Sequence, residues 1–156
     1  MSGTPTERLA QLGLELPPTP APLAAYVPAV RAGSFVHTSG QLPMVDGALA
    51  TTGVVGDQAV DVDVETAAGL ARRCALNALA AVASVVDLDE VVRVVKVTGF
   101  VASAPGFTQQ PAVVNGASEL LGQVFGDAGR HARSAVGVVA LPLGAPVEVE
   151  IVVEVG

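Results

Sequence analysis

Apolar and acidic residues alternate at the C-terminal end of the chain. From Val147 to Val155 every odd-numbered position holds Val or Ile, whereas Glu148, Glu150 and Glu154 occupy even-numbered positions. A period of two predicts a strand that has one apolar face and one face carrying the glutamates. The apolar face is expected to pack on helices, and the acidic face to look away from them.

Two other β-branched segments are expected to be strands. Residues 91–101 contain few breaks and are typical of a central strand, and residues 134–141 follow a polar, turn-rich stretch. Because 134–141 and 147–155 are neighbours in the chain, proximity alone predicts that they pair directly as a hairpin.

Apolar residues spaced three and four positions apart predict two long helices. Residues 64–86 repeat Ala, Leu and Val at this spacing, with Asp63 as the expected N-cap. Cys74 falls on the apolar face and is expected in the core, since a buried free cysteine behaves as a small hydrophobe. Residues 112–125 form the second predicted helix, which ends at Gly126.

The N-terminal end is expected to stand apart from the rest. Residues 6–12 predict one short helix capped by Thr6. The proline-rich stretch 16–22 predicts a stiff linker of the polyproline type. Residues 1–19 are therefore interpreted as a separate arm with its linker, and residues 20–156 as a single domain.

Short strands are expected at 26–30, 34–39 and 48–51, with turns between them, and a Gly/Pro loop at 103–110. The order of the main elements is thus β-β-α-β-α-β-β. This order predicts an α+β fold with a mixed sheet and both helices on one face.

Composition suggests contacts between subunits. The 156 residues are 51% hydrophobic and 15% charged, and their mean hydropathy is +0.56. One domain of this size has a real core, and its surplus apolar surface is expected to lie in a homo-oligomer. The uncharged run 74–86 is too short to span a membrane, and longer uncharged runs carry Pro, Gly and amides. Glu7 and Arg8 stand where a secretory signal would be apolar.

Charge and cysteine content restrict the partners. The net charge is −7, and Lys96 is the single lysine, which opposes a nucleic-acid surface because such surfaces need clustered Lys and Arg. With Cys74 as the single cysteine, an intrachain disulfide is excluded. This usage suits a reducing compartment, so the cytoplasm is the expected location.

Standard catalytic motifs are absent from the sequence. We find no phosphate-binding loop, dinucleotide fingerprint, metal-binding Cys/His cluster or serine nucleophile elbow. The two histidines, His37 and His131, could in principle perform acid–base chemistry as a pair. The surrounding patterns favour structural roles for both.

Three polar features remain as candidates. Arg133 enters a largely apolar strand, and a partly desolvated guanidinium needs an anion, which is either an internal carboxylate or part of a ligand. Glu148 is a candidate proton-transfer group, with a solvated strand face as the alternative. Ser39 and Gly40 end a strand where a ligand could approach the backbone closely, although a simple turn explains them equally well.

Four segments in order resemble the Rid (YjgF/L-PSP) family, and the resemblance covers the chain from residue 21 to the C-terminus. The segments are 26–30 (Tyr-Val-Pro-Ala-Val), 38–43 (Thr-Ser-Gly-Gln-Leu-Pro), 132–134 (Ala-Arg-Ser) and 147–150 (Val-Glu-Val-Glu). The longer chain and the loop 103–107 (Ser-Ala-Pro-Gly-Phe) are similar to the subgroup named YjgF/chorismate-mutase-like endoribonucleases.

The resemblance implies a chorismate-mutase-like fold and a homotrimer whose sheets form a central barrel, with three ligand clefts between subunits. It places the strand 91–101 between 134–141 and 147–155, against the hairpin that proximity suggests. Family members of the deaminase type hydrolyse reactive 2-imino or enamino acids to 2-oxo acids and ammonia, and they use no metal or cofactor.

Roles for individual residues follow from the matched motifs. The resemblance implies that Arg133 holds the substrate carboxylate and that Glu148 positions or activates the attacking water. The remaining cleft residues are implied to be Tyr26, Ser39, Gly40, Phe107, Ser134 and Ala135, together with Asn115 from the neighbouring subunit.

One position departs from the deaminase motif. That motif usually has a cysteine two residues after the arginine, where this chain has Ala135. The cysteine is regarded as a group that lines the cleft, so its loss changes the pocket without removing the proposed chemistry. Two alternatives therefore stay open: a trimeric binding module for small carboxylates that performs no turnover, and the ribonuclease suggested by the subgroup's name.

Overall fold

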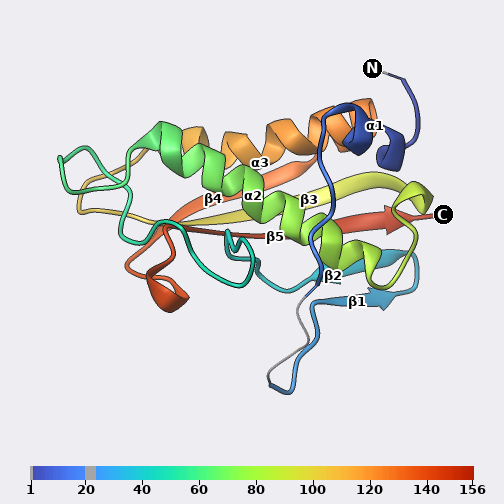
Figure 1. The fold of residues 1–156 in the computed structure, drawn as a ribbon, viewed down its shortest axis with the longest axis horizontal. Coiled ribbons are helices and arrows are strands. Elements are labelled where there is room, and N and C mark those ends of the chain that lie inside the picture. Colours follow the sequence, from blue (N-terminus) through green and yellow to red (C-terminus); the bar gives the residue numbers. More distant parts are fainter. Residues whose placement is uncertain (1, 20–23) are drawn as a thin grey trace.

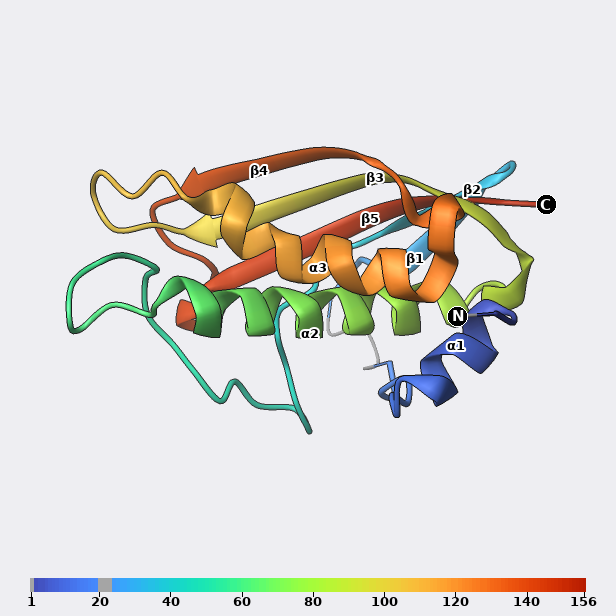
Figure 2. The same ribbon diagram turned by 90° about the horizontal axis from the view of Figure 1, so that it is seen from above.

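The computed structural model describes residues 2–19 and 24–156 and has two layers. One layer is a five-stranded mixed sheet, and the other is a pair of long helices on one face of that sheet (Figure 1, Figure 2). The elements are α1 (Pro5–Gln11), β1 (Ala29–Ala32), β2 (Phe35–Thr38), α2 (Val64–Ala83), β3 (Val91–Ala102), α3 (Gln110–Phe125), β4 (Ala132–Val138) and β5 (Val147–Val155). The predicted α+β class, with both long helices on one face, is confirmed.

The strand order is β1-β2-β5-β3-β4. β3 pairs with β5 in an antiparallel and with β4 in a parallel arrangement, so it lies between them as the family resemblance implies. The hairpin between β4 and β5 that proximity predicts is therefore wrong. β4 is an edge strand, and its register sets Arg133 opposite Val97.

The alternating pattern of β5 is confirmed in full. The side chains of Val147, Val149 and Val153 are completely buried on the helix-covered face. The even-numbered side chains, including Glu148 and Glu150, are half-buried on the other face. We call that uncovered side of the sheet the open face.

α2 begins with the expected cap, whereas α3 has no side-chain cap. The Asp63 carboxylate accepts a hydrogen bond from the Thr66 backbone N–H at 2.7 Å, which satisfies a free donor at the start of α2. α3 starts at Gln110, two residues earlier than expected, with Pro111 in its first turn. It ends before Gly126, whose φ of +62° favours glycine.

Two glycines let α3 pack very closely against its neighbours. A Cβ on Gly99 of β3 would overlap the side chain of Val114, and a Cβ on Gly116 would overlap the backbone carbonyl of Ala68 on α2. The missing side chains thus bring α3 against the sheet on one side and against α2 on the other. Because Asn115 lies between Val114 and Gly116, its position is fixed by both contacts.

The N-terminal helix packs on the domain and does not form a separate arm. Leu9 of α1 is only 4% exposed and joins the core, and the Thr6 backbone N–H donates to the Asp89 carboxylate at 2.8 Å. The helix begins at Pro5, with Thr4 as its N-cap and Glu7 completing a capping box. Thr6 is therefore not the cap, because the capping box of Thr4 and Glu7 starts the helix two residues earlier. The predicted linker 16–22 lies partly outside the described residues.

Two predictions for the segment before α2 need correction. β1 starts at Ala29, later than the predicted 26–30, and it turns at Gly33, whose φ is +60°. The strand predicted near 48–51 does not form, since only an isolated bridge joins Val45 and Ala48. Asp46, with φ of +51°, closes that turn and leaves too few residues for a ladder.

The open face carries exposed apolar side chains. Val30 is 52% exposed, Phe35 41% and Val136 43%, and the strand registers place all three on the same side of the sheet as Glu148. Among the described residues, no helix is both long and apolar enough to cross a membrane.

The close contact of α3 with α2 can be tested with a pair of glycine substitutions in one helix. Gly116→Ala should lower the free energy of unfolding by about 1–3 kcal/mol, because the new methyl group must displace the Ala68 backbone. Gly122→Ala should raise it by about 0.5–1 kcal/mol, since a Cβ at Gly122 meets nothing and alanine favours helix. Urea unfolding of both variants measures the difference, and equal effects would contradict the close approach.

Candidate functional site

Arg133 extends from the edge strand β4 toward the helix layer. Its register partner Val97 is fully buried beneath the helices, and paired side chains in a parallel ladder share a face. Its Nη1 donates to Asn115 Oδ1 at 2.8 Å and to Ser118 Oγ at 3.1 Å. Its Nη2 donates to the Pro111 carbonyl at 3.5 Å, which is at the limit of a hydrogen bond. Three neutral oxygens of α3 therefore hold the guanidinium.

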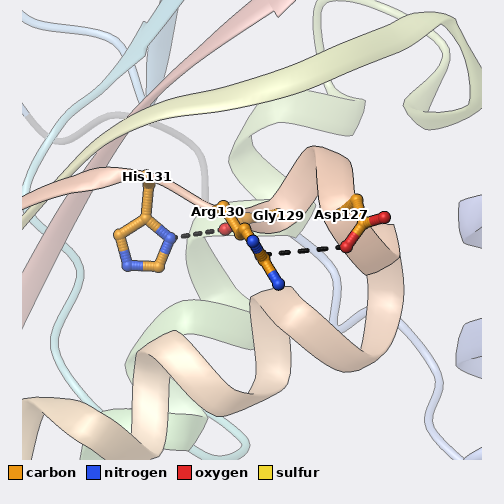
Figure 3. Close-up of polar contacts among 4 residues, drawn as sticks. All are labelled: Asp127, Gly129, Arg130 and His131. Carbon is orange, nitrogen blue, oxygen red and sulfur yellow. Dashed lines mark hydrogen bonds and ion pairs between the residues drawn. The ribbon is translucent and has the colours of Figure 1, made fainter.

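No carboxylate of the described chain pairs with Arg133. The single ion pair among the described residues joins Arg130 Nε to Asp127 at 3.7 Å, and these two side chains are 87% and 98% exposed. Figure 3 shows Arg130 and Asp127 reaching toward each other while the His131 ring points to Gly129. The internal ion pair considered for Arg133 is thus wrong within this chain, because its neighbours on α3 are neutral. Among the residues that the structure describes, the positive charge of Arg133 at the sheet edge has no counter-ion.

The contacts of Arg133 come from one stripe of α3. Pro111, Asn115 and Ser118 are four and three residues apart, so they lie on the same face of the helix. Asn115 reaches Arg133 within a single chain, and its contribution to the cleft of a neighbouring subunit, which the resemblance implies, stays a prediction. Ser118 was not predicted, and its spacing from Asn115 is the signal that could have identified it.

His131 completes this cluster, which we call the arginine cluster: Arg133, Asn115, Ser118, His131 and the Gly129 carbonyl. The His131 ring lies between two partners, with Nδ1 2.6 Å from Gly129 O and Nε2 2.9 Å from Ser118 Oγ. The pattern around His131 favours a structural role, and its contacts join it to the candidate site through Ser118.

Glu148 forms a second cluster with Gly40. A Cβ on Gly40 would come within 2.6 Å of Glu148 Oε1, so the glycine lets the glutamate side chain lie against the backbone. The close approach predicted for a ligand at this glycine is thus made by the protein's own carboxyl group. Burial, with a smaller contribution from the charge of Glu150, raises the pKa of Glu148 above its ordinary value.

The two clusters lie on opposite faces of the sheet of one chain. Glu148 stands between the fully buried Val147 and Val149, and therefore points to the open face. Arg133 contacts α3 on the helix-covered face. One chain does not bring these two side chains together, although the resemblance implies that both act on one substrate.

The remaining cleft candidates have varied surroundings. Tyr26 is 60% exposed before β1, and the Ser39 hydroxyl donates to the Val27 carbonyl at 2.6 Å. Ser134 pairs with Thr98 and faces the open side, while Ala135 packs partly against the core on the helix side.

Phe107 does not line a cleft in this chain. The ring is 6% exposed and belongs to the hydrophobic core. The loop turns at Gly106, with φ of +82°, and the Gln110 amide donates to the Phe107 carbonyl at 2.8 Å. The loop therefore folds the ring inward in this chain, and a contact of Phe107 with a ligand stays a prediction.

Other reactive groups lie outside both clusters. Cys74 is buried, as predicted, and burial raises the pKa of its thiol well above the ordinary range. His37 is exposed on the open face. Within the described part of the chain, no three His, Cys, Asp or Glu side chains are arranged to hold a metal ion.

The raised pKa of Glu148 gives a testable dependence of stability on pH. A carboxyl whose folded pKa exceeds its unfolded pKa binds more protons in the native state, so stability falls as pH rises through that window. Glu148→Gln removes the charged carboxylate whose burial is unfavourable. The variant should therefore melt at an equal or higher temperature than the unchanged protein at pH 8. The difference should shrink toward pH 4, where the unchanged protein gains its proton. Thermal melts across this range measure it, with Glu119→Gln, on the exposed side of α3, as the control. A Glu148→Gln variant that is less stable at pH 8 would contradict the assignment.

Comparison with known proteins agrees with this architecture over nearly the whole chain. Protein TCP17 of Trypanosoma cruzi is 46% identical over 155 residues, which cover 98% of this chain and 95% of that protein. The crystal structure of Atu1372 from Agrobacterium tumefaciens, a protein of unknown function, is 44% identical with a TM-score of 0.87, covering 98% of this chain and 94% of that one.

A shorter relative was solved with a ligand. E. coli TdcF with bound serine is 26% identical with a TM-score of 0.59, covering 88% of this chain and 94% of that one. The family model described as Endoribonuclease L-PSP matches residues 17–155. The chain therefore belongs to the Endoribonuclease L-PSP family, which is the Rid (YjgF/L-PSP) family that its motifs resemble.

Proposed function

We propose that this protein hydrolyses reactive 2-imino or enamino acids to 2-oxo acids and ammonia, in clefts between the subunits of a homotrimer. The observation that carries the proposal is the arginine cluster, in which a guanidinium is held by neutral oxygens and has no carboxylate partner within residues 2–19 and 24–156. Such a group is prepared to bind the carboxylate of a ligand. A relative solved with bound serine supports a ligand of this kind, since serine carries a carboxylate beside a nitrogen-bearing carbon.

The positions of Arg133 and Glu148 support clefts between subunits. Because the two side chains occupy opposite faces of one sheet, we infer that the substrate meets them from different subunits. β4 is an edge strand, so Arg133 lies where another subunit can dock. The exposed apolar residues of the open face, among them Val30, Phe35 and Val136, supply surface for such an assembly.

In the proposed reaction, Arg133 of one subunit fixes the substrate carboxylate and thereby orients the adjacent C=N carbon. Water adds to this carbon, and Glu148 of the next subunit accepts its proton. Glu148 returns the proton to nitrogen, the C–N bond breaks, and ammonia leaves as the carbonyl forms. The hydroxyl proton is released in the same step, so an iminium ion and water give a 2-oxo acid and ammonium.

The environment of Glu148 suits this double role. Its raised pKa lies closer to neutrality, where a carboxyl group both accepts and returns a proton efficiently. The substrate needs little further activation, since a protonated imine is already electrophilic. Gly40 lies against Glu148, and Tyr26 and Ser39 are proposed to line the same cleft. Ala135 is proposed to line it beside Arg133, on the same strand.

The proposal is tested with imines generated in situ by an amino-acid oxidase. The unchanged protein should accelerate their decay, and Arg133→Ala should raise KM by about tenfold to hundredfold, because a charge-assisted bidentate contact is lost. Arg130→Ala is the matched control, since Arg130 lies three residues earlier and is 87% exposed. Equal activity of the unchanged protein and Arg133→Ala would refute the proposal.

A second candidate, a carboxylate-binding module without turnover, is favoured by one observation. Ala135 stands where the deaminase motif has a cysteine, so the cleft lacks one polar group. Calorimetry with a 2-oxo acid separates the two functions: binding together with imine hydrolysis supports the enzyme, and binding alone supports the module. The net charge of −7 disfavours the RNA substrate suggested by the family's name.

A further inference from the structure

We propose that His131 and Ser118 are positioning residues for Arg133, and that their hydrogen-bond chain reserves the Nε/Nη2 edge of the guanidinium for the ligand carboxylate. The inference rests on the proposed function and adds to it a mode of binding and two residues that the family motifs do not include. Its basis is the set of distances within the arginine cluster.

The Gly129 carbonyl determines which groups donate and which accept in the hydrogen bonds that link His131, Ser118 and Arg133. A backbone carbonyl can only accept, so the contact of 2.6 Å requires that His131 Nδ1 carry a proton and donate it. In the neutral imidazole, Nε2 is then an acceptor, and the Ser118 hydroxyl at 2.9 Å donates to it. The tautomer of His131 thus fixes the orientation of the Ser118 hydroxyl.

The same orientation determines what Ser118 offers to Arg133. With its proton directed at His131, the hydroxyl oxygen presents lone pairs to Nη1, 3.1 Å away. Nη1 has two protons, and Asn115 Oδ1 at 2.8 Å takes the other. Both Nη1 protons are therefore used by the protein, and the guanidinium plane is held from that side.

The opposite edge of the guanidinium is open to a ligand. Nε of Arg133 has no acceptor among the described residues, and Nη2 has only the Pro111 carbonyl at 3.5 Å. Nε–H and the second Nη2–H point the same way, and their separation matches the two oxygens of a carboxylate. A ligand carboxylate can therefore accept hydrogen bonds from Nε and Nη2 of Arg133 together, in a side-on bidentate contact.

A holder built from neutral groups suits this role. An aspartate in place of Asn115 would position the guanidinium equally well, but it would pair with the charge that the ligand needs. Two neutral acceptors on Nη1 instead immobilise the side chain while its full charge stays available. The His131–Ser118 link thus prepares the site before the ligand arrives.

The inference is tested by a double-mutant cycle on ligand affinity. The probe is 2-oxobutyrate, its Kd is measured by calorimetry, and the variants are Ser118→Ala, His131→Asn and the two combined. Each single variant should weaken binding by about tenfold, since one hydrogen bond to a charged group loses its geometry. The double variant should be no weaker than Ser118→Ala alone, because His131 acts only through Ser118.

Two further variants make the result specific. Ser118→Thr keeps the hydroxyl and should restore affinity, whereas Arg130→Ala should leave it unchanged. Thermal melts of every variant separate positioning from loss of fold, since Asn at 131 can still donate to the Gly129 carbonyl. Additive effects of the two single changes, or unchanged affinity in both, would overturn the positioning role.

Failure of the inference differs from failure of the proposed function. If Arg133→Ala loses binding while Ser118→Ala and His131→Asn do not, Arg133 still binds the carboxylate and only the positioning chain is refuted. If the unchanged protein neither binds 2-oxobutyrate nor hydrolyses imines, the proposed function itself fails.

Discussion

The structure depends on how closely α3 lies against its two neighbours. Gly99 and Gly116 lack the atoms that would hold α3 away from the sheet and from α2. Between the residues that make these contacts lies Asn115, and one turn later Ser118, which both reach Arg133. Core packing and the arrangement of polar groups are therefore not separate properties. The helix position that excludes water from the core also sets the geometry of the guanidinium.

Much of this architecture could be predicted from local patterns. The period of two in 147–155 determines which side of β5 is buried, and it therefore places Glu148 on the open face. Asp63 marks the start of α2 because its cap depends only on a contact with Thr66, three residues later in the sequence. Pairing β4 with β3 needed the family resemblance, because proximity favours the wrong neighbour.

The partners of Arg133 could not be derived from the sequence in this way. The segment 132–138 has no clean alternation, so its pattern does not reveal that Arg133 faces α3. Ser118 and His131 become visible as one cluster only when the crossing of α3 over β4 is known. The burial of Phe107 was not predicted either, since it depends on the turn at Gly106, which folds the ring into the core.

The neutral character of Asn115 has a consequence for chemical ageing. Asn115 is followed by Gly116, and an Asn-Gly pair in a flexible chain is the sequence most readily converted to aspartate through a cyclic imide. Here that change would give Arg133 a permanent counter-ion at the position of the present amide oxygen. Cyclisation requires the backbone nitrogen of the glycine to reach the side-chain carbonyl, which the helical backbone of α3 opposes. The helix that orients the amide thus also protects it, and the lifetime of the site is tied to the integrity of a single turn.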